Sequence, residues 1–194
     1  KERSDALVVW GGIHPSLLPD MCLKEEYIDI VVVGEGEETA VDLADKLKKG
    51  GSLGDVKGIG YKHKEAGGIY CHLNSSRPFI VNLDKHRIDF SLVNMENYLT
   101  SAMSGKYKRV TGYKTSRGCP YDCGFCYNQE FNKGRWRGYS TSTVFEDIEF
   151  LKREYKIDGI RFYDDNFYAD KDRAIEILQG IGIPASSEIR IDML

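Results

Sequence analysis

The sequence predicts an α/β fold built from two successive series of strands and helices. Two apolar runs, at residues 6–12 (ALVVWGG) and 27–37 (YIDIVVVGEGE), are rich in β-branched residues and contain glycines near their ends. Such runs are typical of strands buried on both faces of a parallel sheet. A helical pattern follows the second run, and strands alternate with helices again from about residue 108. We therefore expect the C-terminal part of a doubly wound, Rossmann-like α/β domain, followed by the first half of a second α/β domain.

The first series has the order strand, helix, strand, helix. A short helix is expected within residues 15–26, between the two apolar runs. A longer helix is expected over residues 37–51, because apolar side chains recur there at helical spacing. The side chains on this apolar face are Ala40, Leu43, Ala44 and Leu47. Gly50 and Gly51 are expected to end the helix, since glycine readily adopts the left-handed conformation that closes a helix.

Residues 55–107 interrupt this alternation. A β-hairpin is expected within residues 55–83, where the runs KGIGYKH and IYCHL flank the glycine-rich segment KEAGG. Residues 82–99 show no clean period, and we interpret them as a connector. The sequence thus predicts three parts, which are residues 1–54, 55–107 and 108–194.

The second series begins with a strand at residues 109–116 that leads directly into a cysteine-rich loop. The most regular helical pattern of the chain follows at residues 143–155, and Thr143 and Glu146 predict a capping box at its start. The apolar residues at helical spacing in it are Val144, Ile148, Leu151 and Tyr155. This pattern predicts an amphipathic helix packed on the sheet.

The alternation continues to the end of the chain. A strand is expected at residues 159–165, and Asp170 is expected to cap the next helix. The apolar residues of that helix are Ala174, Ile175, Leu178 and Ile181. Residues 187–194 (SEIRIDML) are expected to begin a third strand. Because the chain lacks an initiator Met and stops inside this expected strand, we expect it to be an excerpt of a longer protein.

Composition excludes several classes of protein. Of the 194 residues, 41% are hydrophobic and 29% are charged, as in globular domains rather than disordered chains. The net charge of −3 argues against binding nucleic acid by bulk electrostatics. No apolar run approaches the roughly 20 residues of a membrane span, and no signal peptide is apparent. Five cysteines, an odd number, indicate a reducing cytoplasm rather than a disulfide framework.

Three of the cysteines, Cys119, Cys123 and Cys126, have the spacing C-x3-C-x2-C. Thiolates select zinc, copper(I) or iron–sulfur clusters. A closed zinc site requires four ligands, and the histidines lie well upstream, at His14, His63, His72 and His86. Three thiolates leave one iron of a [4Fe–4S] cluster open to a further ligand. A structural zinc site or an unrelated ferredoxin-like site is the alternative.

This triad, with the aromatic Phe125 before its last cysteine, resembles the C-x3-C-x-aromatic-C signature of the radical S-adenosylmethionine (SAM) superfamily. The resemblance implies that SAM chelates the open iron and that Phe125 lies beside its adenine. The reduced cluster would pass an electron to SAM, which would yield methionine and a 5′-deoxyadenosyl radical. Tyr127 is also assigned to the SAM site by this resemblance. An electron donor such as flavodoxin or ferredoxin is implied as a partner.

Polar residues follow the second strand of the cysteine-bearing series, in the stretch YDDNF. In right-handed βαβ units successive strands end on the same side. Asp164, Asp165 and Asn166 should therefore face the cysteine loop, where they are expected to bind the ammonium or ribose hydroxyls of SAM. The alternative is a polar turn before a capped helix. Arg190, on the expected third strand, is also a candidate SAM ligand.

The stretch RWR offers a further candidate. Arg135, Trp136 and Arg137 follow the cysteine loop and are candidates for clamping a carboxylate or phosphate. A solvated loop explains them equally well.

The first series ends its two strands with GGIHP and GEGE. Ligands of open α/β sheets bind beyond such strand ends, and glycine lets the backbone approach them closely. Tight turns are the alternative. Placed ahead of the triad, these two motifs resemble the cobalamin-binding domain of B12-dependent radical SAM enzymes, and the stretch DDNF, which follows the triad, resembles the same class. The resemblance covers most of the chain and implies that the second domain is the first half of a partial, TIM-like (β/α)6 barrel.

The same resemblance implies which residues bind cobalamin. The expected cobalamin-binding residues are Gly11, Gly12, His14, Gly34, Glu35 and Gly36. The glycines are expected to line the nucleotide tail. His14 is more simply a loop residue than a cobalt or iron ligand.

The resemblance implies a cytoplasmic B12-dependent radical SAM enzyme with a small-molecule substrate. A methyltransferase acting at an unactivated carbon or phosphorus centre is the leading interpretation. In that class one SAM methylates cobalamin and another yields the radical. An oxidative ring closure like that of magnesium-protoporphyrin monomethyl ester cyclase is an alternative. Two others are radical SAM chemistry without cobalamin and a structural zinc site in an interaction protein.

Overall fold

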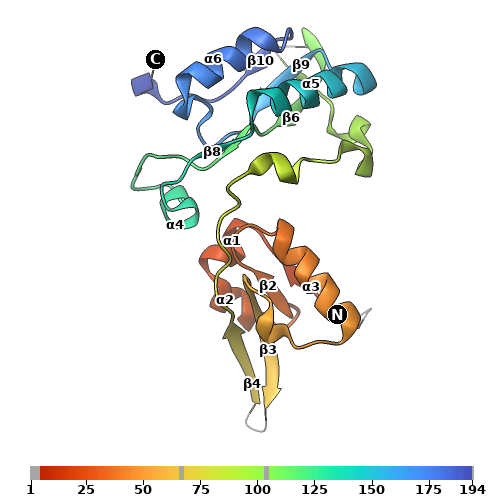
Figure 1. Ribbon diagram of the computed structural model, residues 1–194, viewed down its shortest axis with the longest axis vertical. Coiled ribbons are helices and arrows are strands. Elements are labelled where there is room, and N and C mark those ends of the chain that lie inside the picture. Colours follow the sequence, from red (N-terminus) through yellow and green to blue (C-terminus); the bar gives the residue numbers. More distant parts are fainter. Residues whose placement is uncertain (1–4, 66–67, 103–104, 194) are drawn as a thin grey trace. The chain divides into compact units, whose positions relative to one another are not determined.

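The computed structural model describes residues 5–65, 68–102 and 105–193. The chain divides into two compact units, Lys1–Ile80 and Val81–Leu194, and Figure 1 labels their helices and strands. Each unit has a four-stranded sheet, and the second unit has an additional two-stranded sheet. Within the described residues, no helix combines the length and apolar character needed to cross a bilayer.

The sheet of the first unit combines parallel and antiparallel pairs. Its strands, in order across the sheet, are β1 (Val9–Trp10), β2 (Ile30–Val32), β3 (Ile59–Glu65) and β4 (Gly68–Leu73). β1 and β2 are parallel, whereas β3 runs antiparallel to both β2 and β4. The expected hairpin is therefore confirmed as β3 and β4, and it extends the same sheet.

Strand β2 is the centre of the first unit's core. Ile30 and Val32 pack in a cluster with Leu43 of the long helix, and Val31 packs with Leu23 in a second cluster. Because successive side chains of a strand point to opposite faces, β2 is buried on both faces, as predicted. The same prediction is wrong for β1, whose two residues are exposed because they form the edge of this sheet.

Three helices accompany this sheet. The helix expected within residues 15–26 is two short helices, α1 (Ile13–Leu17) and α2 (Pro19–Lys24), and Pro19 opens the second. The long helix α3 (Glu37–Lys49) ends as predicted at Gly50, whose φ is 66°. A 3₁₀ turn, η1 (Leu53–Asp55), follows it.

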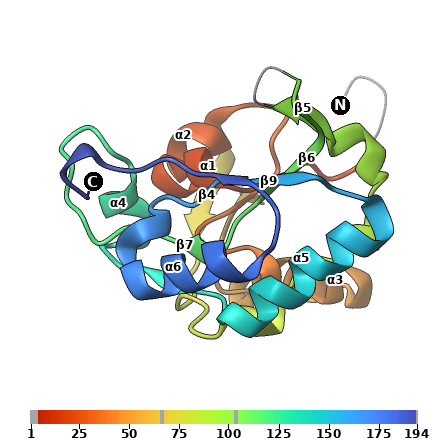
Figure 2. The same cartoon turned by 90° about the horizontal axis from the view of Figure 1, so that it is seen from above.

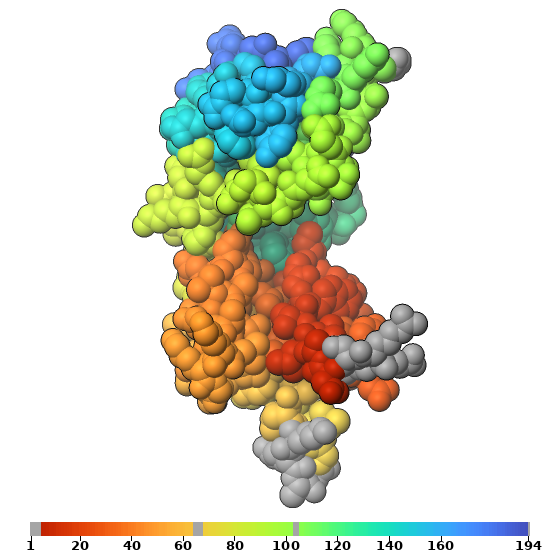
Figure 3. Space-filling model, turned by 90° about the vertical axis from the view of Figure 1, so that its right-hand side faces the viewer, coloured from red at the N-terminus to blue at the C-terminus, as the bar shows by residue number. Residues whose placement is uncertain are grey.

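The buried face of α3 differs from the predicted one. Thr39 and Leu43 are buried, whereas the other members of the expected apolar face, Ala40, Ala44 and Leu47, are exposed. The hydroxyl of Thr39 donates to the carbonyl of Lys57 over 3.3 Å and accepts from Arg77 over 2.9 Å, which turns this side of the helix inward. The outward side of α3 forms an open surface of the first unit, orange in Figure 3.

The second unit has a βαβαβ core, as predicted. Its sheet contains, in order, β10 (Ala185–Ser186), β9 (Gly159–Phe162), β6 (Tyr107–Tyr113) and β5 (Thr100–Ala102). β6, β9 and β10 are parallel, and β5 pairs antiparallel with β6. The helices α5 (Thr141–Tyr155) and α6 (Lys171–Gly180) lie on the same side of this sheet (Figure 2).

Two smaller features complete the second unit. β7 (Ser116–Arg117) pairs antiparallel with β8 (Arg137–Gly138), and between them lie the cysteine loop and the short helix α4 (Asn128–Asn132). The 3₁₀ turns η5 (Phe167–Ala169) and η6 (Ile191–Met193) follow β9 and end the described chain.

Helix α5 starts earlier than its predicted capping box. Ser140 is the N-cap, and its hydroxyl accepts a hydrogen bond from the backbone N–H of Thr143 over 3.2 Å. The predicted box of Thr143 and Glu146 is therefore wrong, because Thr143 already lies inside the first turn. The capping of α6 by Asp170 is confirmed by a 3.1 Å bond from the backbone of Arg173.

The connector consists of three 3₁₀ turns, which explains its lack of helical or strand period. They are η2 (Leu83–His86), η3 (Phe90–Leu92) and η4 (Met95–Tyr98). Each is preceded by an Asn or Asp whose side chain accepts from the backbone N–H two residues on, at Asn82, Asp89 and Asn94. These local bonds compete with regular secondary structure.

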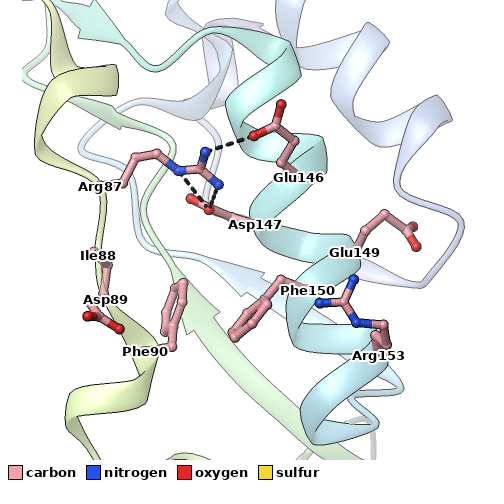
Figure 4. A pocket seen from close by; sticks show the side chains of 9 residues that line it. All are labelled: Arg87, Ile88, Asp89, Phe90, Glu146, Asp147, Glu149, Phe150 and Arg153. Atoms are coloured by element: carbon pink, nitrogen blue, oxygen red, sulfur yellow. Dashed lines mark hydrogen bonds and ion pairs between the residues drawn. The ribbon is translucent and has the colours of Figure 1, made fainter.

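Figure 4 shows how the connector packs against α5 across a surface groove. Arg87 donates to Glu146 over 2.7 Å and forms an ion pair with Asp147. Below it, Phe90 and Phe150 face each other with ring centroids 6.5 Å apart. The hydroxyl of Tyr113 in β6 donates to the other oxygen of Asp147 over 2.7 Å, so this contact joins connector, helix and sheet.

Candidate functional site

The three clustered cysteines lie in one loop without regular structure between β7 and α4. Cys119 is buried, whereas Cys123 and Cys126 are half-buried, and all three are free thiols. The backbone N–H of Cys126 donates to the carbonyl of Cys123 over 2.9 Å, so these two share one turn.

The loop begins at a position that only glycine can occupy. Gly118 has a φ of 85°, and a Cβ added there would lie 1.9 Å from the carbonyl oxygen of Arg135. The close approach of these two backbone segments shapes the start of the loop. Gly118 was not singled out from the sequence, where its only signal is its place directly before the first cysteine.

Asp164 holds the segment that leads into the cysteine loop. Its carboxylate accepts from the backbone N–H of Thr115 over 3.1 Å, from the hydroxyl of Thr115 over 2.8 Å and from the hydroxyl of Ser116. Burial raises the pKa of Asp164, and these hydrogen bonds and nearby Arg173 oppose the rise. Arg173 in turn donates to the carbonyl of Thr115 over 2.9 Å.

Asp165 contacts both ends of the cysteine loop. One carboxylate oxygen accepts from the backbone N–H of Gly118 over 2.8 Å, and the other accepts from the hydroxyl of Tyr127 over 2.9 Å. The ammonium of Lys114 lies 3.5 Å away. The expectation that residues 164–166 face the cysteine loop is confirmed by these contacts, while their binding to SAM stays a prediction.

Two side chains direct N–H groups at the sulfur atoms. The amide of Asn166 lies 3.6 Å from the sulfur of Cys119, and the guanidinium of Arg190 lies 3.0 Å from that of Cys123. Arg190 also stacks on the ring of Tyr121, 3.9 Å from its centroid, and pairs with Asp192 over 2.8 Å.

Arg190 does not lie on a strand, so the strand predicted at residues 187–194 is wrong. The third strand is the earlier β10, and the chain leaves the sheet after it. The alternating isoleucines at 189 and 191 indicated a strand, but the pairing of Arg190 with Cys123 and Tyr121 draws this segment to the cysteine loop instead.

The aromatic residues of the loop differ in environment. Phe125 is 94% exposed, so its ring presents an open face. Burial and the hydrogen bond to Asp165 raise the pKa of Tyr127, which therefore remains a donor. The predicted contact of either residue with SAM stays a prediction.

The donor set of the loop fits a [4Fe–4S] cluster. In the described ranges, no group of three or more His, Cys, Asp and Glu side chains is arranged to hold a single metal ion. A cubane cluster does not require such a group, because each thiolate binds a different iron atom. Three free thiols on one loop, two of them facing N–H donors, are the ligands and outer contacts that such a cluster uses.

The glycine turns expected to bind cobalamin lie together. The hydroxyl of Ser16 donates to the carbonyl of Gly12 over 2.6 Å and accepts from the N–H of Gly34 over 2.9 Å. Gly12 and Gly34 have φ angles of 104° and 85°, and no atom lies within 4 Å of a Cβ built on either. A Cβ on Gly11 or Gly36 would be in ordinary contact with Val32. The bridging role of Ser16 had no signal in the sequence.

The two remaining candidates of the first unit have local partners. His14 is exposed, and its ring centroid lies 5.3 Å from that of Trp10. The carboxylate of Glu35 accepts from the backbone N–H of Ile80 over 2.7 Å. Their contacts with cobalamin stay predictions.

The side chains and backbone of the stretch RWR (residues 135–137) contact other residues of the second unit. Arg137 donates to Asn132 over 3.3 Å, and the guanidinium of Arg173 lies 5.6 Å from the ring centroid of Trp136. The carbonyl of Arg135 is the group that crowds Gly118.

Comparison with known proteins adds a family match. Residues 1–44 match the family model described as B12 binding domain. An uncharacterized methyltransferase of Pyrococcus horikoshii is 39% identical over 178 residues, which are 90% of this chain and 37% of that protein. An anaerobic magnesium-protoporphyrin IX monomethyl ester cyclase of Synechocystis is 32% identical over 82% of this chain and 30% of that protein.

A solved structure shares the fold. The radical SAM methyltransferase TsrM from Kitasatospora setae, with cobalamin and a [4Fe–4S] cluster bound, matches with a TM-score of 0.60 and 19% identity. The match covers 90% of this chain and 33% of that chain. The mixed α/β fold is thus that of a cobalamin-dependent radical SAM protein, and the resemblance expected from the sequence is confirmed. The chain spans about a third of the length of the curated relatives described above.

Proposed function

We propose that this chain carries the iron–sulfur centre and part of the cobalamin site of a radical SAM enzyme. The chain belongs to the family of radical SAM enzymes with a B12-binding domain. One observation carries the proposal. The free thiols of Cys119, Cys123 and Cys126 lie on one loop, and N–H donors face two of their sulfur atoms.

The three cysteines would hold a [4Fe–4S] cluster and leave one iron atom for SAM. When bound, the cluster supplies the electron that cleaves SAM to methionine and a 5′-deoxyadenosyl radical. The residues of this chain bind and orient the groups around it. Phe125 offers its exposed ring to the adenine of SAM. Asn166 and Arg190 hold two of the thiols by hydrogen bonds.

The first unit would hold part of cobalamin at its two glycine turns. The space above Gly12 and Gly34 is open, which suits the close approach of a bulky ligand to the backbone. Gly11, Glu35 and Gly36 flank these turns. His14 is proposed as a contact at the rim of the site rather than as a cobalt ligand.

The reaction that fits best is methyl transfer to an unactivated centre of a small molecule. The Pyrococcus relative, at 39% identity, is named a methyltransferase. Oxidative cyclisation is the second candidate, because the Synechocystis relative is named a cyclase and is 32% identical. A cytoplasmic location and a flavodoxin or ferredoxin as electron donor belong to either reaction.

Anaerobic reconstitution tests the cluster. With iron and sulfide, the chain is expected to take up four irons per molecule and to show visible absorbance that changes when SAM is added. Replacing Cys119 with Ala should abolish this uptake, whereas replacing Cys71, an exposed free cysteine of the first unit, should not. One bound zinc without iron or sulfide would support the structural zinc site instead.

A second measurement tests cobalamin. After incubation with hydroxocobalamin and gel filtration, corrinoid absorbance should accompany the protein. A chain that incorporates the cluster but retains no corrinoid would support radical SAM chemistry without cobalamin.

A further inference from the structure

We infer that Asp165 is a positioning residue that closes the cysteine loop by binding both of its ends. The inference rests on the proposed function, because it concerns how the loop holds its cluster. It assigns to Asp165 a role that does not require direct contact with SAM.

The contacts of Asp165 bracket the cysteines along the chain. Gly118 directly precedes Cys119, and Tyr127 directly follows Cys126. The carboxylate binds the first through its backbone N–H at 2.8 Å and the second through its hydroxyl at 2.9 Å. One side chain therefore fixes the two points at which the ligand loop begins and ends.

The carboxylate is itself firmly held. Its side chain is 10% exposed, and it lies three residues beyond the end of β9, an inner strand of the sheet. Its neighbour Asp164 anchors Thr115 and Ser116, the residues that precede the loop. Hydrogen bonds to an ionised carboxylate are stronger than bonds between neutral groups. The pair of acids thus connects the rigid sheet to the irregular loop.

Both carboxylate oxygens have partners within the protein, which favours a structural role over recognition of SAM. A loop with fixed ends samples fewer arrangements, so the three thiols remain near the positions that a cluster requires. The expected consequence is slower loss of the cluster, even when SAM is absent. A residue that only bound SAM would not have this effect.

The test measures release of iron from the reconstituted chain without SAM. The protein is mixed anaerobically with a ferrous chelator, and the decay of cluster absorbance is followed. For Asp165→Ala we expect release roughly tenfold faster than in the wild type, at the low end of the effects seen when a group that supports metal ligands is lost. Tyr127→Phe removes one of the two hydrogen bonds that Asp165 accepts from the ends of the loop, and it should release iron at an intermediate rate. Asp165→Asn, which keeps one acceptor oxygen, should lie closer to the wild type.

Two substitutions serve as matched controls. Asp122→Ala removes an exposed carboxylate from the same loop, and Tyr163→Phe removes the hydroxyl of an exposed residue that precedes Asp164 in the sequence. Both should release iron at the wild-type rate.

The inference is overturned if Asp165→Ala and Tyr127→Phe release iron at the wild-type rate. Loss of SAM affinity at an unchanged release rate would assign Asp165 to SAM binding. If Asp165→Ala fails to fold by circular dichroism, Tyr127→Phe alone decides. Failure of the wild type to incorporate any cluster would instead contradict the proposed function.

Discussion

Among single residues, Arg190 has the contact with the most direct chemical consequence. Its guanidinium lies 3.0 Å from the sulfur of Cys123 and is oriented by Tyr121 and Asp192. Hydrogen bonds and positive charge at a cluster thiolate stabilise the reduced, more negative state of the cluster. Arg190 is therefore expected to raise the reduction potential of a cluster bound here.

Replacing Arg190 with Met should lower this potential. A contact that favours the reduced over the oxidised cluster by about 1.4 kcal/mol corresponds to a shift of about 59 mV for one electron. A redox titration followed by electron paramagnetic resonance measures it, with the exposed Arg153→Met as control. Equal midpoints for wild type and Arg190→Met would show that this contact does not tune the cluster.

Gly118 is the residue whose substitution should most directly distort the loop. Gly118→Ala places a Cβ 1.9 Å from the carbonyl of Arg135 and requires a positive φ. The conformation alone costs about 1–3 kcal/mol, and the clash adds to it. We expect iron incorporation to fall severely while the far-ultraviolet circular dichroism is retained.

Gly124→Ala is the matched control in the same loop, since no atom lies within 4 Å of a Cβ built there. It should incorporate iron as the wild type does. Normal incorporation by Gly118→Ala would mean that the backbone can move away from Arg135 at little cost.

At the scale of elements, the connector is held on α5 by a partly buried ion pair. The side chain of Asp147 is 7% exposed, and Arg87 is the cation that neutralises it. Burial, followed by the hydrogen bond to Asp147, raises the pKa of Tyr113, which keeps this hydroxyl a donor. Removing Arg87 would leave a buried carboxylate without its charge partner.

Arg87→Ala should therefore destabilise the second unit by about 2 kcal/mol, below the range for fully buried pairs because Arg87 is partly exposed. Chemical denaturation measures the free energy of unfolding. Arg153→Ala, on the same groove, loses a solvent-exposed pair with Glu154 and a contact with the ring of Phe150, and should change it by less than about 1 kcal/mol. Equal effects of the two substitutions would contradict the importance of the pair.

A second junction between elements predicts a dependence on pH. Asp158, just before β9, accepts from the backbone N–H groups of Lys108 and Arg109 in β6, at 3.0 and 2.9 Å. These bonds lower the pKa of Asp158 in the folded state. A lowered folded pKa contributes stability above the unfolded value, about 3.9, and this contribution is lost as the pH falls through the folded pKa.

The stability of the wild type relative to Asp158→Asn should therefore be constant above about pH 5 and decrease below about pH 4. Urea denaturation of both proteins at several pH values measures this difference. Groups that titrate in the same way in both proteins do not contribute to it. A difference that stays constant down to pH 2 would exclude Asp158 as the cause.

On the scale of the whole molecule, the three cysteines proposed as cluster ligands all belong to the second of two compact units. A ligand stabilises the unit that binds it. Incorporation of the cluster should therefore raise the unfolding temperature of one calorimetric transition and leave another unchanged. A single transition that moves as a whole would show that the two units unfold together.

The sequence predicted the regular parts of this molecule well. The extent of α3, the hairpin of β3 and β4, and the βαβαβ order of the second unit follow from local periodicity and turn residues, although the buried face of α3 and the position of the third strand differ from the prediction. The connector was interpreted as irregular, but its three turns were not predicted, because Asx turns have no period. The start of α5 was misplaced because Ser140 competes with Thr143 as a cap, and only tertiary contacts distinguish them.

The candidate site was predictable to the extent that it is local in sequence. The cysteine triad is recognised from the spacing of its three cysteines in the sequence. The place of Asp164 and Asp165 follows from the direction of parallel strands. What each acid contacts depends on residues almost 50 positions away, and no local pattern encodes it. The position of Arg190 outside the sheet likewise depends on its contacts with Cys123 and Tyr121, which are distant in sequence.

The distance in sequence between the cysteine loop and its anchors also bears on synthesis. Gly118 leaves the ribosome 47 residues before Asp165 does. For that interval, the three free thiols are in the nascent chain before the residues that follow β9 can hold their loop. If the thiols hold the proposed cluster, a cell would need to keep them reduced and deliver iron and sulfide after translation has passed β9, so maturation is expected to lag behind synthesis.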